Sequence, residues 1–231
     1  MLDKYKNFLV VAAHPDDDVL GCGGTIASLI KQKKKVKVVF VAEGTSCRFK
    51  NKKIFKKKID NEIEVRNNCG KKALSDLGIK KFKFHNLKCG KLNSYPITEI
   101  AKIIENEISE FKPDVVITHS DNDVNLDHRT VYQASLQSTR PTNKNKIKCL
   151  LAFEILSSTE WKFKKIFEPN YFYCIDKTIN KKIKALKRYK SEIKKFPHPR
   201  SVEGVKTLAK YRGVQSHNKF CEAFKIIRLF S

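Results

Sequence analysis

The sequence predicts a single α/β domain, residues 1–231, built on an open, mostly parallel, Rossmann-like sheet with helices on both faces. Short apolar runs rich in Val and Ile alternate along the chain with longer amphipathic stretches. This alternation is typical of strand–helix units around a parallel sheet. Hydrophobic residues make up 41% of the 231 residues, which is enough for a substantial core.

The first part of the chain contains two strand–helix units. Residues 8–12 (FLVVA) form a short β-branched run, as expected for a buried parallel strand, and a helix is expected over 25–35. Residues 36–42 (VKVVFVA) predict a second strand. The helix expected over 60–77 ends at Gly78, because glycine is a common helix stop.

The same alternation continues to the end of the chain. Lys112-Pro113 closes one of these helices, and Pro96 opens it. The expected elements are a strand over 82–84, a helix over 97–111, a strand over 115–118, a helix from His128 to before Pro141, a strand over 150–155, and helices over 177–195 and 201–211.

The strongest compositional feature is the formal net charge of +24. Such a charge can indicate a partner that is a nucleic acid or an anionic membrane. Most of the basic residues are lysines spread along the chain, without a basic tail or a nucleic-acid-binding motif. A solvated, lysine-rich surface is therefore the better interpretation, and no nucleic-acid partner is expected.

The chain is expected to be cytoplasmic and to lack a membrane span. No apolar run approaches the ~20 residues that a spanning helix needs. The apolar run near the N-terminus is too short for a signal peptide. The seven cysteines are scattered without a CxxC pair, which predicts reduced thiols rather than a disulfide framework.

The most informative motif is AHPDDDVLGCGG, residues 13–24, which directly follows the first expected strand. Three adjacent carboxylates repel one another, so a cation or a reaction must justify them. Pro15 stiffens the turn, and His14 and Asp17 can then converge on one point while Asp16 projects elsewhere. An imidazole and a carboxylate suit zinc or a similar divalent ion.

A third ligand is expected from the segment HSDNDVNLDHR, residues 119–129, which follows another parallel strand. In open α/β sheets the carboxyl ends of the strands meet at one crevice, so His128 can join His14 and Asp17. Two histidines and one aspartate leave a position for water, and iron(II) would also accept this set. Asp16 can then act as a general base in amide hydrolysis, while His119 stays ambiguous.

Two plainer interpretations of the motif stay open. Residues 16–18 can serve as helix caps or turn residues. The glycines at 21, 23 and 24 could indicate a phosphate loop, but neither GxGxxG nor GxxxxGK[ST] is present. Tight packing of a helix on the sheet is the better explanation of these glycines.

These residues resemble the PIG-L/LmbE-like zinc de-N-acetylases, a family that includes deacetylases of glycosyl-phosphatidylinositol, mycothiol and bacillithiol synthesis. The resemblance rests on AHPDDDVLGCGGTIA and NLDHR and extends to FEILSSTEW, HPRS, YRG and CEAFKIIR. It implies that His14, Asp17 and His128 bind zinc and that Asp16 is the general base. It also implies an acetamido-sugar substrate that releases acetate and a free amine.

The resemblance also assigns residues around this centre. It implies that Arg66 contacts the sugar or its attached group, whereas the residue alone would suit a surface helix. Three positions depart from the family pattern. Asp18 stands where Glu is usual and is expected to act at the helix start. Asn125 stands where many members have an oxyanion-binding His, and its amide can still donate a hydrogen bond. Cys89 stands where a sugar-holding Asp is expected.

Three more polar residues complete the expected site. Asp127 is expected to orient a histidine, as carboxylates beside metal ligands do, and either His128 or His119 is a candidate. His198 and Arg200 lie in a Pro-bounded loop between helices. Loops carry binding residues more often than cores do, so both are expected to contact an anionic part of the substrate.

The sequence thus predicts a zinc-dependent deacetylase whose partner is a small acetamido-sugar, with a sugar nucleotide or a similar conjugate favoured. A deacetylase of a thiol-precursor glycoside is the nearest alternative. A catalytically degenerate sugar-binding relative and a basic nucleic-acid-binding module also stay open, and so does the formation of homo-oligomers.

Overall fold

A computed structural model describes residues 1–50, 54–141 and 147–230 and confirms the predicted fold class. One seven-stranded sheet has the order β3-β2-β1-β4-β5-β7-β6. Strands β1 to β5 pair in parallel, and β7 pairs antiparallel with β5 and β6. The strands are β1 (Asn7–Ala12), β2 (Lys35–Ala42), β3 (Lys81–Leu87), β4 (Val115–His119), β5 (Cys149–Phe153), β6 (Tyr171–Cys174) and β7 (Cys221–Leu229).

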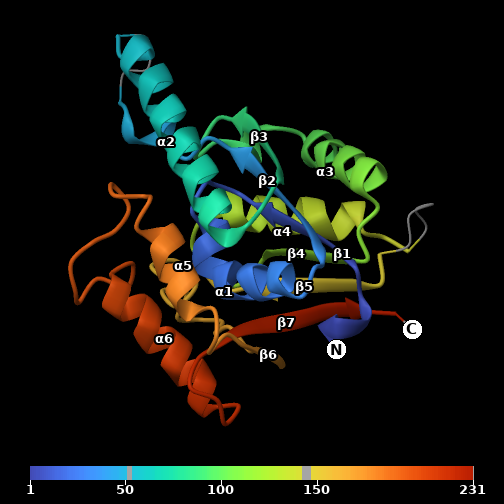
Figure 1. Cartoon of the computed structure of the whole chain (residues 1–231). Coiled ribbons are helices and arrows are strands. Elements are labelled where there is room, and N and C mark those ends of the chain that lie inside the picture. The colour runs from blue at the N-terminus through green and yellow to red at the C-terminus, as the bar shows by residue number, and fades with distance from the viewer. Residues whose placement is uncertain (51–53, 142–146, 231) are drawn as a thin grey trace.

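Helices cover both faces of the sheet (Figure 1). Side chains alternate across a strand, so Val10 of β1 packs into one apolar layer and Val11 into the other. Helices α1, α2, α5 and α6 contribute to the first layer, and α3 and α4 to the second. The helices are α1 (Asp17–Lys31), α2 (Lys56–Leu77), α3 (Ile97–Phe111), α4 (Leu126–Ser138), α5 (Ile179–Leu186) and α6 (Val202–Val214), with short 3₁₀ turns η1 (Leu2–Lys4), η2 (Ser46–Arg48) and η3 (Leu92–Ser94).

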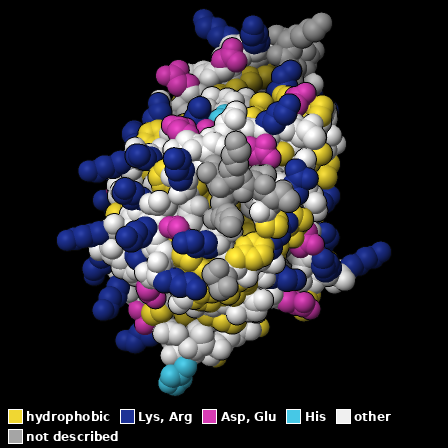
Figure 2. Space-filling view, turned by 90° about the vertical axis from the view of Figure 1, so that its right-hand side faces the viewer, with side chains coloured by type: hydrophobic (Ala, Val, Ile, Leu, Met, Phe, Trp, Pro, Cys, Tyr) yellow, Lys and Arg dark blue, Asp and Glu magenta, His cyan; other side chains and the backbone are white. Residues whose placement is uncertain are grey.

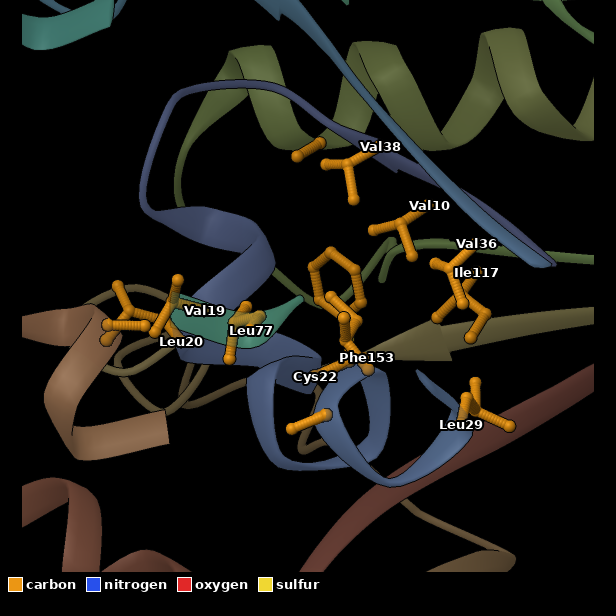
Figure 3. Packing of buried hydrophobic residues seen from close by; sticks show 14 of the residues in the cluster. Val10, Val19, Leu20, Cys22, Leu29, Val36, Val38, Leu77, Ile117 and Phe153 are labelled. Carbon is orange, nitrogen blue, oxygen red and sulfur yellow. The ribbon is translucent and has the colours of Figure 1, made fainter. Parts of the chain in front are cut away.

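Helix α1 packs closely against the sheet and is kinked at Cys22. Figure 3 shows Phe153 of β5 lying over this helix beside Cys22. A Cβ atom added at Gly21 would lie 2.5 Å from the Phe153 ring, and one at Gly24 would lie 2.8 Å from Ile175. The glycines therefore serve close packing, as the sequence predicted.

A carboxylate from the antiparallel strand β7 caps the second half of α1. Glu222 of β7 accepts hydrogen bonds from the backbone nitrogens of Gly24 and Thr25, at 2.9 and 2.7 Å. The buried Lys182 of α5 donates to the same carboxylate at 2.6 Å and to the carbonyl of Leu20 at 2.8 Å. These contacts fix the helix whose first turn carries the acidic motif.

The strand order reverses between β1 and β4, which pair directly. Such a reversal opens a crevice beyond the carboxyl ends of the two strands, where ligands bind in open α/β sheets. His14 follows β1 by two residues, and His119 is the last residue of β4. The fold therefore brings the two polar segments together.

Most of the predicted elements are present, with three differences. Helix α1 begins at Asp17 rather than at residue 25, and the antiparallel strands β6 and β7 were not predicted. The helix predicted over 177–195 is wrong beyond Leu186. There the chain turns inward, because Tyr189 is buried in the core and Glu192 pairs with arginines from two other segments.

Lysine and arginine side chains are scattered over the face in Figure 2, with acidic side chains among them. This distribution resembles a solvated surface more than a single basic groove. None of the helices in the described ranges is long and apolar enough to cross a membrane.

Candidate metal centre

The carboxylate of Asp17 lies among three histidines at the crevice. Its Oδ2 atom is 3.3 Å from His14 Nδ1, 3.3 Å from His128 Nε2 and 3.5 Å from His119 Nε2. One ligand atom from each of His14, Asp17 and His128 lies within 4.8 Å of the other two, and all three residues are buried. The structure thus brings together the three residues that the sequence predicted as ligands.

The local chain positions His14 and Asp17 through a tight turn. The Asp17 nitrogen donates to the His14 carbonyl at 3.2 Å, and the His14 nitrogen donates to Asp17 Oδ2 at 2.8 Å. Between them, the backbone of Asp16 has φ +128°, a conformation that residues other than glycine rarely adopt. Strain of this kind, of the order of 1–3 kcal/mol, persists where the surroundings impose it and is common at functional sites.

Asp127 orients His14. Its Oδ2 atom lies 2.9 Å from His14 Nε2, although the two residues are 113 positions apart. The backbone nitrogens of Gly90 and Leu92 donate to the same carboxylate at 2.6 and 3.1 Å. Asp127 therefore contacts neither of the two histidines that the sequence left open for it, and His14 Nδ1 is the ring atom that faces Asp17.

Asp123 orients His128 as Asp127 orients His14, and the sequence had not indicated this residue. Its Oδ2 atom lies 3.0 Å from His128 Nδ1 and accepts from Thr159 Oγ1 at 3.0 Å. Its Oδ1 atom accepts from Asn125 nitrogen at 2.7 Å and from Ser158 Oγ. The ring of His128 is therefore fixed with Nε2 toward Asp17. The only sequence signal for this residue was its place in the acidic loop before the helix.

His119 packs against the ligand cluster as a neutral imidazole. Its Nε2 atom accepts a hydrogen bond from the Ala13 nitrogen at 2.8 Å. Its ring stacks on that of His128 with centroids 4.1 Å apart. Burial, together with the neighbouring His128, lowers the pKa of His119 to about 3. We therefore assign it a packing and positioning part.

The electrostatic environment of the centre favours a bound positive charge. Burial by itself would lower the pKa of both other histidines, yet hydrogen bonds and Coulomb attraction from the aspartates raise the pKa of His14 to about 10 and that of His128 to about 9. Asp17 Oδ1 and His128 Nε2 are buried and have no hydrogen-bond partner among the residues that the structure describes. A divalent cation fits this donor set, because it satisfies both atoms and the surrounding acids at once.

Asp16 lies beside these ligands and is held by two arginines. Arg66 Nη2 lies 3.0 Å from Asp16 Oδ1, and Arg200 Nη1 donates to Oδ2 at 3.2 Å. Arg66 also donates to the Pro15 carbonyl at 2.7 Å and is buried, so it is not a surface cation. Glu192 pairs with Arg66 and with Arg48, which orients the guanidinium groups. Whether Arg66 or Arg200 also contacts a substrate stays a prediction.

The remaining predicted residues lie at helix starts and in loops. Asn125 caps α4, where its Oδ1 accepts from the Asp127 nitrogen at 2.9 Å. Asp18 is buried in the first turn of α1, and burial raises its pKa to about 7. His198 is half-buried, accepts from the Arg200 nitrogen at 3.1 Å, and has its ring centroid 6.4 Å from that of Trp161. Their predicted catalytic or binding parts stay predictions.

Comparison with solved structures places this fold among known proteins. The N,N'-diacetylchitobiose deacetylase of Pyrococcus horikoshii superposes with a TM-score of 0.76 at 20% identity, covering 98% of this chain and 85% of that one. The 4-carboxy-2-hydroxymuconate hydratase GalB of Pseudomonas putida KT2440 superposes with a TM-score of 0.72 at 22% identity, covering 96% of each chain. At such identities these likenesses show the fold alone.

Sequence comparison is more specific. The chain is 30% identical over 194 residues to YaiS of Escherichia coli K12, described as an uncharacterized deacetylase, with 82% of this chain and 93% of YaiS covered. The family model of the GlcNAc-PI de-N-acetylases, PIG-L, matches residues 9–139, which is more than half of the chain and includes both ligand segments. The chain therefore belongs to the PIG-L (GlcNAc-PI de-N-acetylase) family.

Proposed function

We propose that this protein is a zinc-dependent deacetylase that removes the acetyl group from an N-acetylated amino sugar carried on a larger conjugate. The observation that carries the proposal is the cluster of His14, Asp17 and His128, in which two buried ligand-type atoms have no hydrogen-bond partner within the described ranges. A cation is the partner that these atoms lack, and membership of a deacetylase family supports the reaction.

The residues around the cluster support a general-base mechanism. Zinc bound in such a site supplies Lewis-acid polarisation and a water of lowered pKa. Asp16 takes the proton of the attacking water and returns it to the departing amine. Burial raises the pKa of Asp16, against the opposing effect of Arg66 and Arg200, and a raised pKa makes a carboxylate a better base. The two arginines hold its oxygens in one orientation.

We propose that Asn125 assists at the oxyanion. Its carbonyl oxygen caps α4, which leaves the amide NH₂ as the group that can donate. A neutral amide can stabilise a developing oxyanion but cannot supply a proton. Asp16 therefore carries both proton transfers in this proposal.

The surroundings support a substrate with an anionic part. A hollow of about 370 Å³ lies beside the loops that follow β2 and β3, and its lining includes Lys56 and Lys88 together with Glu43 and Asp60. Arg200 and His198 approach the centre from another loop. A phosphate-bearing or carboxylate-bearing group joined to the sugar could pair with Lys56 or Lys88 in the hollow or with the guanidinium of Arg200. The Pyrococcus horikoshii neighbour is a deacetylase of N,N'-diacetylchitobiose, which is an acetylated amino sugar.

The test is acetate release from a panel of acetamido-sugar nucleotides and glycosides, with the metal content of the purified protein measured in parallel. We expect one divalent ion per chain and acetate release from at least one conjugate. His128→Ala should lose both, whereas His217→Ala, which removes an exposed histidine, should keep both.

Two results would overturn parts of this proposal. Equal metal content in His128→Ala and the wild type would show that the ligand assignment is wrong. A metal-loaded protein that binds acetamido-sugars but releases no acetate would favour the non-catalytic relative. The fold by itself does not settle the reaction, because the hydratase GalB has a similar one.

A further inference from the structure

Two cysteines from different loops face each other at the same edge of the sheet. Cys47 lies in η2, after β2, and Cys89 lies in the loop after β3. Their sulfur atoms are 2.9 Å apart, which is close for two sulfurs that are not bonded. Cys47 is exposed and Cys89 is buried. The pair adjoins the metal centre, because Cys89 Sγ lies 3.7 Å from His14 Nε2.

The backbone holds both cysteines in this position. Glu43 accepts hydrogen bonds from the nitrogens of Thr45 and Ser46, at 2.5 and 2.9 Å, in the loop that carries Cys47. The same carboxylate accepts from the Cys89 nitrogen at 2.9 Å. One side chain thus ties the two loops together and fixes the sulfurs opposite each other.

We propose that Cys47 and Cys89 form a reversible disulfide when the folded protein meets a low-molecular-weight disulfide such as oxidised glutathione. A disulfide has an S–S length of 2.03–2.05 Å, so the sulfurs need to approach by only about 0.9 Å from their 2.9 Å separation. The exposed loop of Cys47 can supply this movement. The inference rests on the loops alone and does not depend on the reaction proposed above.

The chemistry proceeds by two exchanges. The Cys47 sulfur attacks one sulfur of the glutathione disulfide, forms a mixed disulfide and releases one glutathione thiol. The Cys89 sulfur then attacks Cys47 Sγ, the protein disulfide forms, and the second glutathione thiol leaves. Two protein thiols are oxidised, one glutathione disulfide is reduced, and the two protons leave on the two glutathione thiols. The order follows exposure, since Cys47 is exposed and Cys89 is buried.

A soft metal ion is the competing occupant of this corner. Cys89, His14 and Asp127 offer ligand atoms within 4.8 Å of one another. However, the Asp127 carboxylate already accepts from His14, Gly90 and Leu92. Two thiolates on one zinc would also have to move apart to about 3.8 Å, as the Zn–S length of about 2.3 Å and tetrahedral geometry require. The existing contacts therefore favour the disulfide.

The consequence of the bond is local. It joins the loops after β2 and β3, and it turns the thiol beside His14 into a poor metal ligand. The oxidised form should then bind metal at the three-residue centre without competition from a neighbouring thiolate. The cross-link should also raise the melting temperature, because it constrains the unfolded chain between the two cysteines.

The test uses the full chain incubated with oxidised glutathione, followed by intact mass, peptide mapping without reduction, and thermal unfolding. We expect a cross-linked peptide that contains Cys47 and Cys89 and lacks two hydrogen atoms, an intact mass without glutathione on either residue, and a rise in melting temperature of roughly 4–10 °C. Reduction with dithiothreitol should reverse all three changes. Cys174→Ser, which removes another exposed cysteine, should behave like the wild type.

The two single variants separate the steps. Cys89→Ser should stop at one glutathione attached to Cys47, and Cys47→Ser should not react at this pair because Cys89 is buried. A wild-type protein that keeps glutathione on Cys47, or keeps both thiols free, would overturn the proposal. So would binding of an additional zinc ion that both variants lose, with no disulfide in the wild type.

Discussion

Replacing Asp123 by asparagine should weaken the metal centre without removing any proposed ligand. The Asp123 carboxylate is buried and accepts four hydrogen bonds. Two of them come from groups whose hydrogens cannot rotate away, the Asn125 backbone nitrogen on Oδ1 and the His128 ring on Oδ2. The other two come from the hydroxyls of Ser158 and Thr159, which can turn.

An asparagine cannot satisfy both fixed donors. If its NH₂ group replaces Oδ1, it meets the backbone N–H of Asn125. If it replaces Oδ2, it meets the Nδ1–H of His128, and the ring must then carry its proton on Nε2. That atom lies 3.3 Å from Asp17 Oδ2 and is the one that a metal needs free. Either arrangement therefore disturbs the orientation or the tautomer of His128.

The expected loss in metal affinity is about 10- to 100-fold, as for other residues that orient metal-bound histidines. This loss corresponds to ~1.4–2.7 kcal/mol of binding free energy. The assay is zinc titration against a competing chelator, with Asp121→Asn as the matched control. Asp121 lies in the same loop but pairs with Lys165 at the surface, so its variant should bind zinc like the wild type. A dissociation constant for Asp123→Asn within twofold of the wild type would refute the reasoning.

Three further outcomes follow from other contacts. Asp16→Asn should keep the metal but slow acetate release by roughly 10²–10⁴-fold, and unchanged kinetics would remove Asp16 from the mechanism. Lys182→Met leaves the buried Glu222 carboxylate without its cationic partner and should lower the free energy of unfolding, measured in urea, by roughly 3–5 kcal/mol. Adding Glu222→Gln should restore part of this loss, and no recovery would contradict the pairing. Gly24→Ala places a methyl group 2.8 Å from Ile175 and should cost ~1–3 kcal/mol in the same assay, and a neutral result would mean that α1 can move away from its neighbour.

The sequence was sufficient for the fold class because its main signals are local. The apolar runs at 8–12 and 115–118 correspond to β1 and β4, and the helix over 97–111 was predicted to the residue. The antiparallel strand β7 was missed, because its formation depends on tertiary pairing with β5 and β6. The helix over 177–195 was overextended because its lysine-rich pattern is helical locally, whereas the burial of Tyr189 depends on the tertiary fold.

The same distinction applies to the candidate site. His14 and Asp17 could be paired from their spacing, since one turn controls both side chains. The partner of Asp127 could not be found in this way, because the residue that it contacts, His14, lies 113 positions away and both nearer histidines looked equally suitable. The two arginines that hold Asp16 come from α2 and from the loop before α6, which only the packing of these segments brings together.

These contacts explain why so many acids can lie in one buried place. Each proposed histidine ligand is held by a carboxylate from outside its own strand or turn: His14 by Asp127, and His128 by Asp123. Each of those carboxylates is in turn held by a backbone nitrogen, which keeps it directed at its histidine. Only Asp17 keeps a carboxylate oxygen free in the cluster. The arrangement therefore leaves Asp17 as the proposed aspartate ligand and uses Asp123 and Asp127 to orient imidazoles, at the place where the loops after β1, β3 and β4 meet.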